Sequence, residues 1–178
     1  MAKKKRKKDK INDKKLIKYI KKESDFKKLN WKVFVICLIF VIAVAFAGSF
    51  STNTGKWYED IKPGIALPSW AFSIIWAIIY YMIAISMYYA WLSADNSEKR
   101  KKVIILFTNN FILNIAWSFI FFVLKDPGFA LIDVIILFLS TATMVYINWK
   151  TCRRASYLLI PYLIWLIYAV ILTYLAYI

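Results

Sequence analysis

The chain has 178 residues, of which 61% are hydrophobic and 19% aromatic, with a formal net charge of +15, two cysteines and no histidine. A soluble domain of this length needs a polar surface and uses about 45–50% apolar residues, so the composition predicts an integral membrane protein. The absence of histidine excludes Ser-His-Asp and Cys-His nucleophiles, HExxH zinc sites and haem ligation by a proximal histidine. Cys37 and Cys152 fit neither a disulfide framework nor a CxxC motif. We expect no metal site and no required cofactor.

The positive charge is concentrated in residues 1–32, which contain fifteen Lys or Arg residues against four Asp or Glu residues. Such a block of like charges repels itself, so this tail is predicted to be disordered or, where apolar residues interleave with lysine, interfacial. The run KKKRKK is an unspecific nucleic-acid signal. Because an apolar span follows directly, we expect attraction to anionic lipid, at ~1 kcal/mol per basic residue near the surface, and no nucleic-acid partner.

Residues 33–178 are predicted to form one all-α domain of five transmembrane helices. A bilayer core requires about 20 apolar residues per helix. Pro63, Gly64 and Pro68 interrupt the second apolar stretch, which leaves residues 51–68 as an ordered loop. Lys125–Gly128 reads as a tight turn, so the helices on either side are predicted to be antiparallel neighbours. The five helices are expected at about 33–50, 69–92, 103–124, 128–149 and 156–177.

The distribution of basic residues predicts the orientation of the bundle. The tail, the 93–102 loop and the 150–154 loop carry twenty-two Lys or Arg residues, against three (Lys56, Lys62 and Lys125) on the opposite side. The positive-inside rule then places the N-terminus in the cytoplasm and the C-terminus outside. A composition rich in Lys and Ile and poor in Ala is typical of a prokaryotic chain, so we expect a multi-pass protein of a prokaryotic cytoplasmic membrane.

A few polar side chains lie inside the predicted spans. Asn110, Asn114 and Ser118 are spaced four residues apart and form one stripe, with Trp117 beside it. Such a stripe faces protein or a cavity rather than lipid. It serves either interhelical hydrogen bonding, which we favour, or the polar edge of a ligand. For Asp133 we favour structural capping or pairing over a proton relay, because no second buried acid accompanies it.

Three of the eight tryptophans, Trp76, Trp117 and Trp165, fall deep in three different helices, whereas others lie where aromatic belts are expected. Indoles that converge from separate helices form a flat-walled apolar box suited to a planar ring. Plain packing is the alternative interpretation.

Residues 57–91 read WYEDIKPGIALPSWAFSIIWAIIYYMIAISMYYAW, which resembles the tryptophan-rich sensory protein, or translocator protein, family (TspO/MBR). Asn114 with the segment 117–122, Ala130 to Asp133, and the segment 158–169 resemble three further family blocks. The chain departs from the pattern at Leu67, where the family has proline, and at three further positions. Asn110 replaces a usual glutamine, Thr173 replaces asparagine, and no basic residue follows Tyr174.

The resemblance implies a five-helix bundle, usually a homodimer, with a pocket beneath the first loop. Porphyrins such as protoporphyrin IX and haem are the implied ligands, and sterol binding has little support. Trp57 and Pro63 would shape the loop as a lid over the pocket. The implied ligand-binding residues are Trp76, Asn110, Asn114, Trp117, Phe129, Ile136, Trp165 and Ala169.

Three functions remain open, with a purely structural scaffold as the alternative to all of them. The leading hypothesis is a porphyrin-binding membrane sensor or regulator. The second is an enzyme that degrades porphyrin in light, with Trp76 and Trp165 as the candidate catalytic residues. The third is a transporter or shuttle of porphyrin or lipid, although the sequence has no inverted repeats or multiple buried charges.

Overall fold

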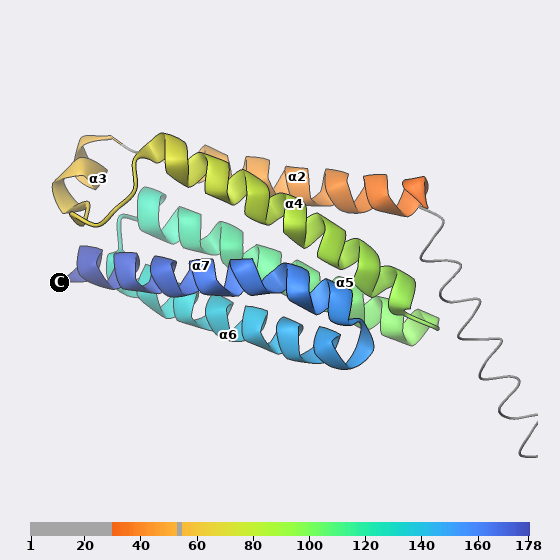
Figure 1. Cartoon of the computed structure of the whole chain (residues 1–178). Helices are drawn as coiled ribbons and strands as arrows, with labels where there is room; N and C mark the ends of the chain where they lie inside the picture. The colour runs from red at the N-terminus through yellow and green to blue at the C-terminus, as the bar shows by residue number, and fades with distance from the viewer. Residues whose placement is uncertain (1–29, 53–54) are drawn as a thin grey trace, which may run out of the picture. The chain divides into compact units, whose positions relative to one another are not determined.

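The computed structural model describes residues 30–52 and 55–178, so the expectations for the basic tail lie outside the described residues. Residues Val33–Ile178 form one compact unit. Every regular element in the described part is a helix, and five of these helices are long and apolar enough to cross a membrane (Figure 1). The predicted all-α bundle of five spans is therefore confirmed.

The five long helices follow one another along the chain, joined by short connections except between the first two. They are α2 (Trp31–Ser51), α4 (Ser69–Ser93), α5 (Ser97–Ser118), α6 (Pro127–Thr151) and α7 (Arg153–Tyr177). Two shorter elements, which the sequence did not predict, lie at one end of the bundle: α3 (Lys56–Ile61) and the π-helical turn η1 (Phe119–Val123). In Figure 1 the C-terminus of α7 lies at the same end as α3.

Capping residues explain where two helices begin. Helix α5 starts at Ser97 rather than near residue 103, because the Asn96 side chain accepts a hydrogen bond from the backbone nitrogen of Lys99 at 2.9 Å. The charged turn that precedes the apolar run is therefore part of the helix. Helix α6 starts at Pro127, and the Asp126 carboxylate accepts from the backbone nitrogen of Phe129 at 3.0 Å.

Small residues let α4, α6 and α7 approach closely. Ala155 is fully buried, and its carbonyl accepts a hydrogen bond from the Ser86 hydroxyl of α4 at 2.8 Å. The Ser156 hydroxyl donates to the carbonyl of Val145 on α6 at 2.8 Å. Packing and hydrogen bonds of this kind hold helices together in lipid, where the hydrophobic effect between helices is absent. Helices α5 and α6 are also in contact, as the tight turn between them predicted.

The π-helical turn η1 widens the end of α5. The backbone nitrogen of Leu124 donates to the carbonyl of Phe119 at 3.1 Å, a bond that spans one residue more than in an α-helix. Lys125 follows in a left-handed conformation with φ of 55°, and the chain then turns into α6. The wide turn contains Phe121 and Phe122, which are both buried.

Candidate functional site

A cavity with two lobes opens between the helices at the end capped by α3. The lobes share five lining residues, namely Thr52, Phe72, Ser73, Trp117 and Phe122. The loop lobe, of about 100 Å³, lies beneath the connection between α3 and α4 and reaches Ala169 and Thr173 of α7. The helix lobe, of about 290 Å³, lies between α2, α4 and α5.

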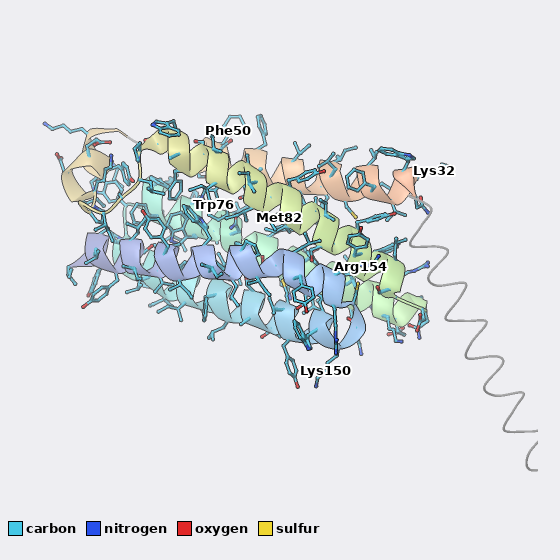
Figure 2. The ribbon with its side chains drawn as sticks, viewed as in Figure 1. Lys32, Phe50, Trp76, Met82, Lys150 and Arg154 are labelled. Atoms are coloured by element: carbon cyan, nitrogen blue, oxygen red, sulfur yellow. The ribbon has the colours of Figure 1, made fainter. Side chains whose placement is uncertain are left out.

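Aromatic rings form the walls of both lobes. Trp117 lines the two lobes and stacks on Phe121, with ring centroids 5.3 Å apart and an angle of 20° between the planes. Trp76 lines the helix lobe, and its ring meets Trp165 of α7 edge to face at 6.2 Å. Figure 2 shows Trp76 inside the bundle, on the side of α4 that faces α7. Trp165 therefore packs against Trp76 but lines neither lobe.

The connection that covers the loop lobe is anchored to α7 and to η1. The Tyr168 hydroxyl donates to the carbonyl of Ile65 at 3.0 Å and accepts from the backbone nitrogen of Leu67 at 3.2 Å. In α3, the ring of Trp57 meets Phe121 edge to face at 5.7 Å. Pro63 lines the loop lobe. Of the two predicted lid residues, Pro63 thus faces the cavity, and Trp57 packs α3 against Phe121 of η1.

Tyr58 lines the loop lobe and also contacts a charged side chain. Its ring lines the lobe and lies 5.6 Å from the ring of Phe122. The Lys62 ammonium sits 5.8 Å from the centroid of the Tyr58 ring, which is a cation–π contact. Burial, together with the charge of Glu59, raises the pKa of the Tyr58 phenol.

A chain of hydrogen bonds runs from the helix lobe into the centre of the bundle. Tyr80 of α4 contacts the Asn114 side chain at 2.6 Å, and Asn114 contacts the Tyr162 hydroxyl of α7 at 3.3 Å. Tyr162 contacts Asn110 at 3.3 Å, and Asn110 contacts Thr141 of α6 at 2.9 Å. The stripe of Asn110 and Asn114 therefore joins four helices, as the favoured interpretation predicted.

One carbonyl at the end of this chain fixes the direction of every bond. The Thr141 hydroxyl must donate to the Leu137 carbonyl, at 2.9 Å, because a carbonyl can only accept. Thr141 has then used its single proton, so Asn110 donates its amide N–H to Thr141 and turns its oxygen towards Tyr162. By the same logic Tyr162 donates to Asn110, Asn114 donates to Tyr162, and Tyr80 donates to Asn114.

Several predicted ligand-binding residues are brought together by the fold. Trp76, Asn114 and Trp117 line the helix lobe, and Trp117 and Ala169 line the loop lobe. Asn110 is 1% exposed, lines neither lobe and acts within the hydrogen-bond chain. The sequence did not single out Phe72, Tyr58 or Tyr80 as lining residues. Tyr80 could have been found from its position four residues after Trp76, because residues four apart lie on the same face of a helix.

Phe129 and Ile136 do not reach the cavity, so the assignment carried over to them from the family pattern needs correction. Their side chains are 67% and 47% exposed on the outside of α6. The reason is helical phase: the buried face of α6 contains Ala130, Val134 and Leu137. Phe129 and Ile136 are seven residues apart and share a face that points away from that buried stripe.

Three buried polar atoms near this end lack hydrogen-bond partners within residues 30–52 and 55–178. They are the indole nitrogens of Trp117 and Trp165 and the Oδ2 oxygen of Asp133. The expected pairing of Asp133 is thus not found in the described part, and Asp126 caps α6 instead. Among the described residues no three Cys, Asp or Glu side chains lie close enough to share a metal ion.

Five apolar spans around a cavity define a multi-pass integral membrane protein of the helical-bundle class. A sequence profile of the TspO/MBR family matches residues 34–178. The chain therefore belongs to the TspO/MBR family of membrane sensory and translocator proteins, which confirms the resemblance seen in the sequence.

Named relatives come from archaea, bacteria and animals. The tryptophan-rich protein TspO of Archaeoglobus fulgidus is 35% identical over 153 residues, which cover 84% of this chain and 97% of that protein. The human translocator protein is 30% identical over 121 residues, covering 67% of this chain and 72% of its own length. The tryptophan-rich sensory protein of Cereibacter sphaeroides is 25% identical over 138 residues, covering 77% and 84%.

Proposed function

We propose that this protein binds a tetrapyrrole, such as protoporphyrin IX or haem, in the two-lobed cavity and acts as a membrane sensor of that ligand. The observation that carries the proposal is the pair of indoles, Trp76 from α4 and Trp117 from α5, that line one lobe. Aromatic faces stack on planar rings and contribute about 0.5–1.5 kcal/mol per pair beyond the burial of area. Family membership supports the proposal, because relatives are sensory and translocator proteins.

The charges around the cavity suit an amphipathic ring. No charged side chain lines either lobe within the described residues, so the apolar part of a macrocycle is favoured inside. Lys62 lies over Tyr58, and Lys125 lies 6.0 Å from the centroid of the Trp57 ring. The Lys62 ammonium stands beside a lining residue of the loop lobe and is paired with Glu59 at 3.6 Å, so a ring carboxylate that replaced Glu59 as its partner would find opposite charge and water there.

The size of the cavity sets a condition on binding. Ligand pockets usually enclose about 300–1,000 Å³, whereas the helix lobe has about 290 Å³ and the loop lobe about 100 Å³. A tetrapyrrole would therefore use both lobes and displace the covering connection outward. That connection is held to α7 by the two hydrogen bonds of Tyr168, which a ligand can break at modest cost.

The test is a titration of the purified full chain in nanodiscs with protoporphyrin IX, followed by the shift of the porphyrin absorption band. Replacing Trp117 or Trp76 by leucine is expected to weaken binding about tenfold, through lost stacking and area. Trp149→Leu is the matched control, because Trp149 is 43% exposed and lines neither lobe. Equal affinities in all three variants and the wild type would contradict the proposal.

The aromatic contacts also favour a second candidate, light-dependent porphyrin breakdown. Trp76 touches Trp165, and Trp165 touches Tyr168 with ring centroids 5.1 Å apart. An excited porphyrin beside Trp76 would take one electron from the indole, giving a porphyrin radical anion and an indole radical cation that Trp165 could share. Dioxygen from the air is the oxidant that this candidate requires to open the ring, so illumination of the complex in air should consume the ring more slowly in Trp165→Phe than in wild type. Equal rates, or rates no faster than with free indole, would remove this candidate.

A further inference from the structure

Gly48 of α2 leaves an open space above two oxygens of neighbouring helices. A Cβ atom placed on Gly48 would lie 3.8 Å from the Oγ of Ser118 and 3.9 Å from the phenol oxygen of Tyr80. All three residues line the helix lobe. Because glycine has no side chain, the oxygens from α5 and α4 meet the lobe at this point, where any larger residue on α2 would cover them.

The hydrogen-bond chain determines what these oxygens offer. Tyr80 donates its only proton to Asn114, at 2.6 Å, so its phenol oxygen can only accept a further bond. The Ser118 hydroxyl has no hydrogen-bond partner within residues 30–52 and 55–178 and can either donate or accept. The space beneath Gly48 therefore presents one acceptor and one free hydroxyl side by side.

The surroundings select an uncharged group. The lining of the helix lobe contains no charged side chain among the described residues. A carboxylate that reached this depth would lose its water without gaining a cation, which costs far more than burying a hydroxyl that is hydrogen-bonded. A hydroxyl group can donate to Tyr80 and accept from Ser118 at the same time.

We propose that Gly48, Tyr80 and Ser118 form a subsite that binds an uncharged hydroxyl group on the edge of a ring ligand. Its use for tetrapyrroles rests on the proposed function. In that case the edge of the ring with a hydroxyl substituent enters the helix lobe, and the edge with carboxylates stays near Lys62.

The first experiment compares two small ring probes of similar size, 2-naphthol and 2-methylnaphthalene, for binding to the full chain in nanodiscs. The measured quantity is the ratio of the affinities for 2-naphthol and 2-methylnaphthalene. With the wild-type protein this ratio is expected to be about fivefold higher than with empty nanodiscs, which is the effect of about one hydrogen bond. Gly48→Ala should abolish this preference, because its methyl group covers both oxygens at ordinary contact distances. Gly64→Ala is the matched control, since a Cβ at Gly64 meets nothing within 4 Å.

A second variant separates the subsite from the fold. Ser118→Ala removes a hydroxyl that bonds to no other described residue, so thermal unfolding should be unchanged while the preference for 2-naphthol falls. Gly48→Ala should unfold at the same temperature or higher, because alanine is the better helix former. A wild-type chain without the preference, or a preference that survives in both variants, would overturn the subsite.

The last comparison links the subsite to the proposed ligand. Haematoporphyrin carries hydroxyethyl groups where protoporphyrin IX carries vinyl groups, and both have the same propionates. Wild type is expected to favour haematoporphyrin, and Gly48→Ala to lose that preference. If no porphyrin binds while the naphthol preference holds, the tetrapyrrole function fails and the subsite stands. If porphyrins bind and both preferences are absent, the subsite fails and the tetrapyrrole function stands.

Discussion

The phenol oxygen of Tyr168 on α7 lies 3.2 Å from the backbone nitrogen of Leu67, in the connection that covers the loop lobe. The same phenol group donates its O–H to the carbonyl of Ile65 at 3.0 Å. One side chain thus satisfies two backbone groups of a segment that has no regular structure between α3 and α4. The position of this covering connection depends on a helix that is about 100 residues away in the sequence.

We expect Tyr168→Phe to loosen this connection. Two hydrogen bonds worth about 1 kcal/mol each are lost, while the ring keeps its packing against Trp165. Hydrogen exchange of the amides around Leu67 should become roughly tenfold faster or more, without a change in the middle of the spans. Tyr174→Phe, on the exposed side of the same helix, serves as the control. Equal exchange in the two variants would show that Tyr168 does not hold the connection.

The two adjacent asparagines of α5 should respond very differently to substitution. Asn110→Leu breaks the chain of hydrogen bonds between Tyr162 and Thr141 and is expected to lower the free energy of unfolding by about 1–2 kcal/mol. Asn109→Leu, at an exposed position, should leave the free energy of unfolding unchanged or raise it. Unfolding in mixed micelles with increasing SDS measures both. A similar loss in both variants would mean that the buried chain adds nothing specific.

The close approach of α4 and α7 predicts sensitivity to side-chain size at Ala155. This residue is fully buried beside Ser86, so Ala155→Leu should overpack the interface and cost about 1–3 kcal/mol. Ala43→Leu makes the same change at an exposed position of α2 and should have little effect on the free energy of unfolding. The same SDS unfolding measurement applies, and tolerance of leucine at Ala155 would argue against tight packing there.

The orientation predicted by the basic residues can be checked with single cysteines. Glu59→Cys in α3 should react with a membrane-impermeant maleimide added outside intact cells, and Glu98→Cys at the start of α5 should react only after the cells are opened. The native Cys37 and Cys152 are buried, so they should react little with the maleimide. The reverse labelling pattern would overturn the predicted orientation.

The five spans were predictable because each requires only a long apolar stretch with few charges, a property of composition along the chain. The helix starts at Ser97 and Arg153 were not, because charged residues that extend a helix beyond the bilayer resemble a loop in a count of apolar residues. The short helix α3 was missed for a related reason: six residues provide too few turns for a periodic pattern.

The cavity was predictable only in part. Trp76, Asn114 and Trp117 were identified by their depth in the spans and by the family pattern, and all three line the helix lobe. Phe129 and Ile136 show the limit of that approach, because the phase of α6 around its axis follows from packing against its neighbours. The direction of the bonds from Tyr80 to Thr141 depends on three-dimensional contacts among four helices, which no spacing within one helix reveals.

The π-helical turn at Phe119–Val123 contains one residue more than the α-helical geometry needs. Each residue of an α-helix advances the chain by about 100° around the axis. Deleting a single residue there would restore ordinary helical pitch and swing the following Lys125 and Asp126 by about that angle. The Asp126 side chain, which caps the start of α6, would then point in another direction. The segment therefore tolerates no deletion of even one residue, although it lies beside a surface turn.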